Sequence, residues 1–455
     1  MKDGIRQEIV SLAVPVVLSS LLQRATSIAD IFLVGGLGAA AITAVGIAQL
    51  LTLFAMTVVW GLSAGATVVV AQLWGARRYE EARAAAFQAL LIGIAVGLAI
   101  SVLGVSMGHS LAVFLGADHQ VLVLVRPYLV VVFSFMLCSL LVNLLSAVMY
   151  GTRNTRPPLW AAVVMNLIHI LVAYPMINGI WGAPHCGVLG AAIATAVSET
   201  VGAVFLLVLS VKKHHIRPTK PSARLMSHVM RVGLPVAGDR LVQQAGQVMY
   251  LKVIMLYGTA AYAAHQVGMS IEAMSFLPGL GISMAATTAV GQRVGAQQFL
   301  QATIAHREAN RLALLVMVGM GSIFFLVPGP LLRMFTVDSD VIALGIPLLQ
   351  IVAFLQVPMA ITMVLAGSLR GAGDTRPLFW STLVGSWGLR VPLAWLFATV
   401  LHLDLIAVWS LLIADWLGRM VVLGHRYHSE RWRQQSPIHG PVSASPAVLA
   451  TAKSG

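Results

Sequence analysis

The chain of 455 residues is 58% hydrophobic and only 10% charged, with a mean hydropathy of +0.87. About a quarter of the residues in a soluble domain are charged, so this composition excludes an ordinary soluble protein and indicates an integral membrane protein. The net charge of +13 would suggest a nucleic-acid partner for a soluble protein, but basic loops beside a membrane account for it, and no nucleic acid is predicted.

Twelve apolar stretches are long enough to cross a membrane as helices. A spanning helix needs about 20 mostly apolar residues, and open strands cannot satisfy their backbone in lipid. In chain order, the predicted spans cover residues 10–33, 44–72, 85–108, 122–149, 158–179, 187–210, 230–256, 263–292, 309–329, 341–368, 377–400 and 404–425. The predicted fold is therefore all-α and integral to the membrane.

The loops between these spans orient the chain and divide it into domains. Lys and Arg gather on the side that carries both termini, whereas the opposite side has only Arg126 and Arg333. Basic loops stay in the cytoplasm, so we expect both termini to be cytoplasmic. The predicted domains are an N-terminal six-helix bundle over residues 1–210, a cytoplasmic linker over 211–229, a C-terminal six-helix bundle over 230–425 and a disordered cytoplasmic tail over 426–455.

The two halves of the chain repeat each other at one constant offset, which is the separation between Pro15 and Pro235. The other landmarks that recur at this offset are Gln23 as Gln243, Gln72 as Gln292, Gly75 as Gly295, and Asn154–Pro157 as Asp374–Pro377. Such a duplication in a very apolar chain is typical of a transporter built from two like bundles. Each half has six predicted spans, so both halves have the same orientation across the membrane.

Six motifs resemble those of the multidrug and toxic compound extrusion (MATE) family, in the order in which that family has them. They lie at Asp30–Gly35, Val70–Ala76, Gly187–Thr195, Ala263–Gln266, Ala285–Ala296 and Leu369–Pro377. The resemblance extends from about residue 8 to residue 425. It implies a V-shaped pair of six-helix bundles around a central cavity, and export driven by an inward H⁺ or Na⁺ gradient.

Asp30 is the first candidate for coupling transport to that gradient. An acid inside a span is costly and usually has a partner or a task. Apart from Asp404 at the first position of the last span, five acids lie inside the predicted spans, namely Asp30, Glu199, Asp239, Glu272 and Asp415. Similar MATE proteins use an acid at the place of Asp30 to bind a cation or a proton. The alternative interpretation of Asp30 is a structural acid at the outer end of its helix.

The fifth and sixth spans supply further candidates for the coupling site. In Na⁺-coupled members of the family, the fifth helix has an acid four residues after an Asn, and this chain has Ala173 and His169 at those places. Thr195 in the sixth span matches the family. A hard cation prefers several oxygen ligands, so the missing carboxylate favours H⁺ over Na⁺. We predict Asp30 as the carrier, with His169 and Thr195 in its network, and a hydrogen-bonded core histidine is the alternative for His169.

The second half supplies candidates for the substrate cavity. Gln243 stands where some relatives carry an acid. Two interpretations of Glu272 are equally supported, an ion pair with Lys252 or a position in the cavity that binds a cationic drug. Asp239 with Arg240 is a second predicted ion pair.

Two soft side chains and several bases bear on the cargo itself. Met249 and Phe276 are predicted to form an adaptable cavity wall, with core or lipid-facing positions as the alternative. Basic residues within the spans leave anionic or neutral cargo open, and these residues are Arg24, Arg240, Lys252 and Arg390.

Four residues are predicted to serve gating. Pro15 and Pro235 occupy equivalent places in the first and seventh spans, where each removes a backbone hydrogen bond and permits a kink. Asn154 and Asp374 are predicted to cap the helices that follow them and to help lock the cytoplasmic end.

The predicted function is an antiporter in the inner membrane of a bacterium that exports small amphipathic organic compounds, cations included, in exchange for H⁺ or Na⁺. We expect a monomer in contact with membrane lipids. A flippase for a lipid-linked precursor is the alternative function. No enzyme is predicted, because the chain has neither paired Asp-rich motifs nor a Gly-rich nucleotide loop with Lys. Cys138 and Cys186 form no disulfide framework or metal spacing, and no metal or other cofactor is predicted.

Overall fold

The computed structural model describes residues 2–212 and 216–438, and all regular structure in these ranges is helical. The first half contains α1 (Lys2–Gly35), α2 (Ala39–Gly75), α3 (Tyr79–Phe114), α4 (His119–Ser134), α5 (Met136–Gly151), α6 (Arg156–Asn178) and α7 (Val188–Lys212). The second half contains α8 (Ala223–Met255), α9 (Thr259–Gly295), α10 (Phe299–Leu326), α11 (Pro328–Arg333), α12 (Ser339–Ala372), α13 (Arg376–Thr382), α14 (Val391–Trp395) and α15 (Leu405–His428).

These helices confirm the predicted all-α membrane architecture. Ten helical segments of the described chain are long and apolar enough to cross a membrane, and α4 and α5 form an eleventh span with a bend of 45° between them. One of the ten runs from Arg376 to Val400 and includes α13, α14 and two π-helical stretches, Leu383–Arg390 and Leu396–Val400. The 33-residue α8 corresponds to the remaining predicted span, but polar residues such as Asp239 and Arg240 lower its hydropathy.

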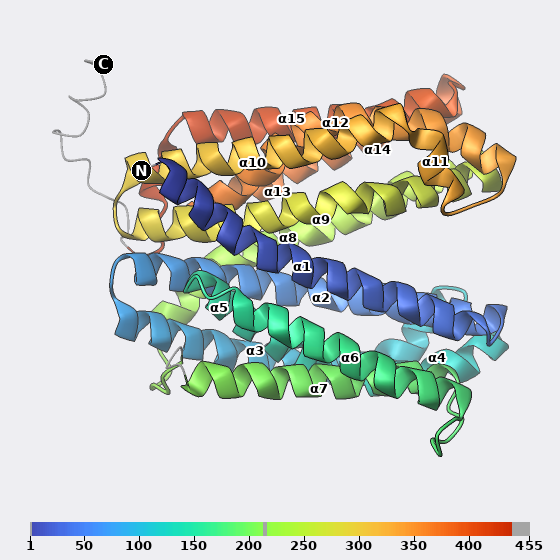
Figure 1. Cartoon of the computed structure of the whole chain (residues 1–455), viewed down its shortest axis with the longest axis horizontal. Coiled ribbons are helices and arrows are strands. Elements are labelled where there is room, and N and C mark those ends of the chain that lie inside the picture. Colours follow the sequence, from blue (N-terminus) through green and yellow to red (C-terminus); the bar gives the residue numbers. More distant parts are fainter. Residues whose placement is uncertain (1, 213–215, 439–455) are drawn as a thin grey trace.

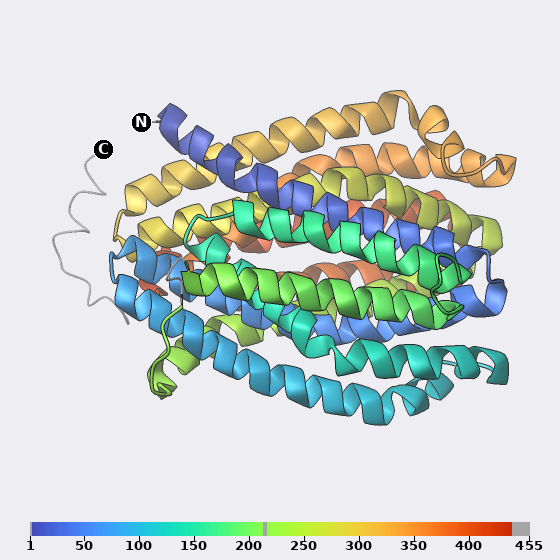
Figure 2. The ribbon, with the colours of Figure 1, turned by 60° about the horizontal axis from the view of Figure 1, so that its bottom comes forward.

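The helices form two bundles, α1–α7 and α8–α15, arranged as a V (Figure 1). The bundles lie close together at the end of the molecule that carries both termini, and they diverge toward the other end. We call these the closed end and the open end. The turned view shows the start of α1 beside α10 and the rest of it running along α6 (Figure 2).

The backbone carries the repeat that the sequence predicts. Gly38 precedes α2 with φ 98° and ψ 174°, and Gly258 precedes α9 with φ 97° and ψ 177°. Both residues lie in the left-handed region that favours glycine, so the same tight turn begins the second long helix of each half. The halves are therefore two copies of one helical design.

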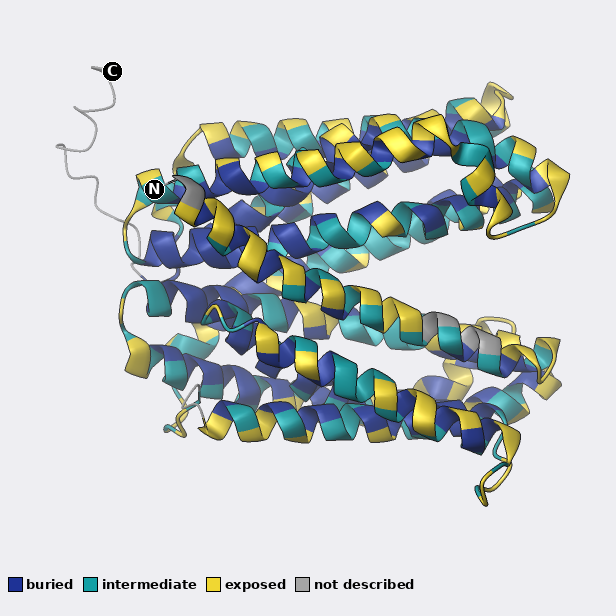
Figure 3. Ribbon diagram, in the orientation of Figure 1, coloured by how far each residue is buried: buried dark blue, intermediate teal, exposed yellow. Residues whose placement is uncertain are grey.

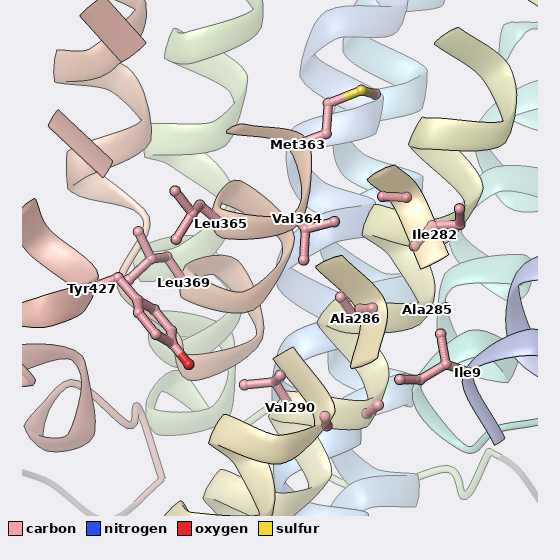
Figure 4. Close-up of a cluster of buried hydrophobic side chains, with 14 of the residues drawn as sticks. Ile9, Ile282, Ala285, Ala286, Val290, Met363, Val364, Leu365, Leu369 and Tyr427 are labelled. Carbon is pink, nitrogen blue, oxygen red and sulfur yellow. The ribbon is translucent and has the colours of Figure 1, made fainter. Parts of the chain in front are cut away.

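Each half inserts the start of its first helix into the core of the other half. Ile5 and Ile9 of α1 are buried in the core of the second half, where Figure 4 shows Ile9 beside Ala285 of α9. In the equivalent exchange, Leu225 and Val229 of α8 pack in the core of the first half. Burial of these apolar side chains joins the bundles at the closed end.

The closed end is also where the long helices of the two halves approach most closely. Figure 3 shows α2 and α9 mostly buried toward this end and more exposed toward the open end. A Cβ added at Gly75 would lie 1.8 Å from the carbonyl oxygen of Gln292, and one added at Gly295 would lie 1.9 Å from that of Gln72. Only glycine permits this contact between backbones.

Two predicted domain boundaries need correction. Half of the predicted linker is helical, because α8 begins at Ala223 with Ser222 as its N-cap. The predicted disordered tail is ordered from 426 to 438, and residues 439–455 lie outside the described part of the chain. Trp432 packs in the core of the second half and Ile438 in that of the first, so residues 431–438 form a strap across both bundles. Burial of these two apolar side chains explains why this stretch folds.

Candidate coupling site and substrate cavity

Asp30 and His169 form a buried pair inside the first bundle. Nε2 of His169, on α6, lies 2.6 Å from Oδ1 of Asp30, near the open end of α1. His169 is only 2% exposed and Asp30 only 8% exposed. A carboxylate and an imidazole at this distance share a hydrogen bond whose proton occupancy changes the net charge of the pair. The structure therefore brings together two of the three predicted coupling residues.

Further polar groups of the first bundle surround this pair. Glu199 on α7 and Tyr128 on α4 lie within electrostatic reach of His169 and Asp30, respectively. One carboxylate oxygen of Glu199, Oε2, is buried and has no hydrogen-bond partner among the described residues. Thr195 lies one turn before Glu199, but its hydroxyl donates to the carbonyl of Ala191 in its own helix. Thr195 thus has no bond to the Asp30–His169 pair.

A cavity of about 320 Å³ lies between the two bundles. Its walls come from α1, α2 and α5 of the first half and from α8, α9 and α12 of the second half. Two threonines that are equivalent in the repeat, Thr67 and Thr287, lie in its wall toward the closed end. Aromatic side chains, amides and hydroxyls share the lining with two arginines, and the predicted cavity residue Phe276 is among them. A lining of this kind can hold an amphipathic organic molecule.

Helix α1 connects the coupling pair to this cavity. Val16, Ser19, Ser20 and Gln23 line the cavity from the middle of α1, and Asp30 lies two turns further along the same helix. Pro15 lies inside α1 and leaves the carbonyl of Ser11 without its helical donor. The hydroxyl of Thr155 lies 3.5 Å from that carbonyl oxygen, so a group outside α1 replaces the missing helical donor with a weak contact.

The second bundle contains a buried network of charges in which each acid has a partner. Asp415 of α15 pairs with Nε of Arg419 at 2.6 Å and with Nη1 of Arg390 at 3.3 Å. Arg419 also donates to Thr382, and Thr382 donates to Asp239 at 2.5 Å. The network thus runs from α15 to α8 through the helix that begins at Arg376.

This network corrects two predictions about the second half. Within the described residues, no ion pair joins Asp239 to Arg240 or Glu272 to Lys252. Asp239 instead accepts the hydrogen bond of Thr382. Glu272 lines a side cavity of about 240 Å³ inside the second bundle, together with Gln243, Arg390 and Arg419. Phe276 lines both this side cavity and the cavity between the bundles.

Met249 is predicted to line the substrate cavity together with Phe276. It is half-buried on α8, and it lines none of the cavities described above. Pro235 lies inside α8, at the place equivalent to that of Pro15 in α1.

Ion pairs connect the two halves at the closed end. Glu8 of α1 accepts two hydrogen bonds from Arg293 of α9, at 3.0 and 2.9 Å, and pairs with Arg153 at 2.9 Å. Burial lowers the pKa of Arg153, which lies in the turn between α5 and α6, and Glu8 opposes that shift. Glu8 therefore connects the start of the first half to both sides of the interface.

The capping prediction for Asp374 is wrong. Thr375 is the N-cap residue of α13 and Thr155 that of α6, and neither side chain makes a capping bond. Asp374 instead accepts a hydrogen bond of 2.6 Å from Nε of Arg426 on α15, and this ion pair neutralises its charge. Asn154 precedes Thr155 in the equivalent turn, and Pro follows both turns at the start of the next helix, as predicted.

Sequence reasoning missed three residues of this arrangement. Glu199 appeared only as one of five intramembrane acids, and Gln72 only as a landmark of the repeat. Arg370 appeared only as part of the motif Leu369–Pro377, although it lines the cavity. The available sequence signal for Arg370 was the repeat, in which this arginine is the equivalent of the uncharged Tyr150. In the structure both residues line the same cavity.

The duplicated helical bundles, the cavity between them and the buried titratable pair define the class of the protein as an integral membrane transporter. The chain belongs to the MATE family, since the family model MatE matches residues 15–175 and 235–396, one segment in each half. It is 30% identical over 438 residues to the "Probable multidrug resistance protein NorM" of Thermotoga maritima, with 95% of this chain and 94% of that relative covered.

Solved structures share the fold. One is described as the outward-facing conformation of a multidrug resistance MATE family transporter of the MOP superfamily, with a TM-score of 0.85, 22% identity, and 94% and 96% of the two chains covered. Another is a MOP superfamily transporter from Pyrococcus furiosus, whose binding pocket is described as having reverse polarity. It has a TM-score of 0.87 and 22% identity, and 95% and 96% of the two chains are covered.

Proposed function

We propose that this protein is a proton-coupled antiporter that exports amphipathic organic compounds across the inner membrane of a bacterium. Both termini would then lie in the cytoplasm and the V would open to the outside. The orientation is supported by the basic loops, which gather at the closed end, whereas the arginines near the open end in the described chain are Arg126 of α4 and Arg333 at the end of α11.

The observation that carries the proposal is the bond of 2.6 Å between Asp30 and His169. A proton that enters from the outside reaches this pair near the open end of α1 and removes one negative charge from it. A buried pair that loses its net charge no longer requires the same polar surroundings. Na⁺ is the alternative coupling ion, but a hard cation prefers oxygen ligands, and the partner of Asp30 is a ring nitrogen.

The path from the proton to the cargo is α1 itself. When the pair is protonated, α1 bends at Pro15, and Ser19, Ser20 and Gln23 move relative to the opposite wall of the cavity. The smaller cavity releases its cargo to the outside, and loss of the proton to the cytoplasm resets the helix. Each proton bound thus opposes cargo binding, as an antiporter requires.

Transport by everted membrane vesicles tests this function with two xanthene dyes, cationic rhodamine 6G and anionic carboxyfluorescein. We expect energised vesicles to accumulate at least one dye, a protonophore to abolish accumulation, and replacement of Na⁺ by K⁺ to leave it unchanged. Asp30→Asn should abolish accumulation at normal protein level. Asp338→Asn is the matched control, because Asp338 is an exposed N-cap at the open end and Asn caps equally well.

Two results would refute the proposal. One is no accumulation of either dye by energised vesicles with the wild-type protein present. The other is full accumulation by the Asp30→Asn variant, because then the carboxylate does not couple the proton to the cargo. Accumulation that depends on Na⁺ and ignores the protonophore would replace H⁺ by Na⁺ as the coupling ion.

A further inference from the structure

The charged residues that line the cavity between the bundles all come from the second half, although many of its lining positions are equivalent in the repeat. Several lining positions are equivalent pairs of the two halves, among them Thr67 with Thr287 and Val16 with Val236. Two other pairs differ in charge. Tyr150 of the first half corresponds to Arg370 of the second half, and Ser20 corresponds to Arg240. Both positive charges therefore lie on the wall of the second half.

No acid lines this cavity among the residues that the structure describes. Asp239, which precedes Arg240 in the chain, lines a smaller cavity of about 60 Å³ that Arg240 and Arg370 also line, and it accepts the hydrogen bond of Thr382 there. Glu272 lies in the separate side cavity of the second bundle. The cavity between the bundles thus presents two arginines and no described carboxylate.

Arg370 is the more telling of the two arginines. It is only 7% exposed, and its Nε has no hydrogen-bond partner among the described residues. Neither Arg370 nor Arg240 lies within ion-pair distance of an acid in the described chain, although Asp239 is within electrostatic reach of Arg370. A buried cation without an ion-pair partner is unfavourable unless an anion from outside completes it. Arg240 is half-buried, and the weak 3.4 Å contact of its Nη1 with Gln243 leaves donors for a ligand.

We propose that this cavity binds amphipathic organic anions, with a carboxylate or sulfonate held by Arg370 and Arg240. The rest of such a molecule would lie against Trp60, Phe276 and Met284, which supply an apolar wall. The cavity volume of about 320 Å³ is within the range of about 300–1,000 Å³ that is usual for sites of drug-sized ligands. Planar guanidinium groups match the two oxygens of a carboxylate or the three of a sulfonate.

This inference names the cargo class of the proposed exporter and rests on that proposed function. It also replaces the expectation of cationic cargo. A cationic drug in this cavity would meet two like charges and no described carboxylate, which disfavours its binding.

Direct dye binding by the purified full-length protein in detergent tests the inference. Fluorescence anisotropy would compare carboxyfluorescein with rhodamine 6G, two dyes of similar shape and opposite charge. We expect the wild-type protein to bind carboxyfluorescein more tightly. Arg370→Gln should weaken that binding by about tenfold or more, since it removes charge-assisted hydrogen bonds to the anion. Arg370→Lys, which keeps the charge, should retain most of it.

Two further variants keep the result interpretable. Arg126→Gln makes the same change on the exposed surface of α4 and should bind both dyes as the wild type does. Arg240→Gln removes the half-buried arginine and tests the cavity if Arg370→Gln fails to fold. Tighter binding of rhodamine 6G by the wild-type protein, or unchanged carboxyfluorescein binding by Arg370→Gln and Arg240→Gln, would overturn the inference.

The outcome is separable from that of the proposed function. If vesicles export rhodamine 6G in an Asp30-dependent way while carboxyfluorescein does not bind, proton-coupled export stands and the anion site fails. If carboxyfluorescein binds through Arg370 but energised vesicles transport neither dye, the anion site stands and the proposed export fails.

Discussion

Gln72 and Gln292 make the same hydrogen bond in opposite directions across the closed end. Nε2 of Gln72 donates to the carbonyl oxygen of Gly371 in the second half at 2.8 Å, and Nε2 of Gln292 donates to that of Gly151 in the first half at 2.8 Å. The two donors are equivalent in the repeat, and so are the two acceptors. The two glutamines therefore hold the two halves together with one repeated interaction.

The double variant Gln72→Leu with Gln292→Leu should loosen the closed end. Each substitution leaves a glycine carbonyl oxygen without its amide donor, at a cost of about 1–3 kcal/mol, so the population should move toward a form that is open at this end. Spin labels at Phe114→Cys and Met334→Cys, after Cys138 and Cys186 are replaced by Ser, would report shorter distances between the halves at the open end.

These two label sites are well suited to the measurement. Phe114 and Met334 are equivalent in the repeat. Phe114 ends α3 and is 86% exposed, and Met334 follows α11 and is 78% exposed, both at the open end. Gln120→Leu, the same change on an exposed turn of α4, should leave the distance distribution unchanged. An unchanged distribution in the double variant would show that the glutamines do not hold the closed end.

Gly75→Ala should destabilise the protein, whereas Gly46→Ala on the same helix should not. The new methyl group at position 75 would lie 1.8 Å from a backbone oxygen of α9, which forces the halves apart, whereas position 46 has no atom within 4 Å. Alanine at an open helical site is favoured over glycine by about 0.5–1 kcal/mol. Thermal unfolding in detergent should therefore shift down for Gly75→Ala and remain or rise for Gly46→Ala, and equal melting temperatures would contradict the close contact.

Asp415→Asn should destabilise the second bundle. The substitution leaves Arg419 and Arg390 buried beside a neutral amide, and the loss of one partner of a buried ion pair costs about 3–5 kcal/mol. Glu430→Gln breaks the exposed pair with Arg433 and should cost less than about 1 kcal/mol. Chemical unfolding in mixed micelles would measure both, and a small loss for Asp415→Asn would mean that water reaches the network.

Trp432→Ala should weaken the hold of the strap on the closed end. Trp432 is 2% exposed and stacks on Tyr427, so its truncation costs about 3–5 kcal/mol. The strap also contributes the Ser436 hydroxyl, which donates to Oε1 of Gln72 at 2.8 Å. We expect faster proteolysis after position 430 and a lower melting temperature than for Trp160→Ala, a substitution at an exposed site on α6. Equal proteolysis of the two variants would contradict this role.

The spans and the repeat were predictable because both depend on local chemistry. Apolar length predicts a helix in lipid, and turn residues such as Gly38 and Gly258 recur wherever the same backbone conformation is needed. Asp30 was predictable for a similar reason, since an acid in an apolar helix has few explanations other than a partner or a task.

The partners of charged residues were harder to predict, because they depend on which helices become neighbours. Asp239 precedes Arg240 in the chain, yet its bond is to Thr382, and Asp374 binds Arg426 of α15 although a cap was predicted. The order of the strap had no local signal either. Its Ser, Gln and Pro residues resemble a solvated tail, and only the contacts of Trp432 and Ile438 with two different cores order it.

The exchanged helix starts bear on how such a chain arose. Ile9 completes the core of the second half and Val229 that of the first, so neither half has a finished interior of its own. A lone ancestral half would have found the missing segment only in another copy of itself, which is the arrangement of a domain-swapped homodimer with a two-fold axis along the membrane normal. Gene fusion would then have joined two subunits that already depended on one another, and it freed each to diverge, as Tyr150 and Arg370 have done.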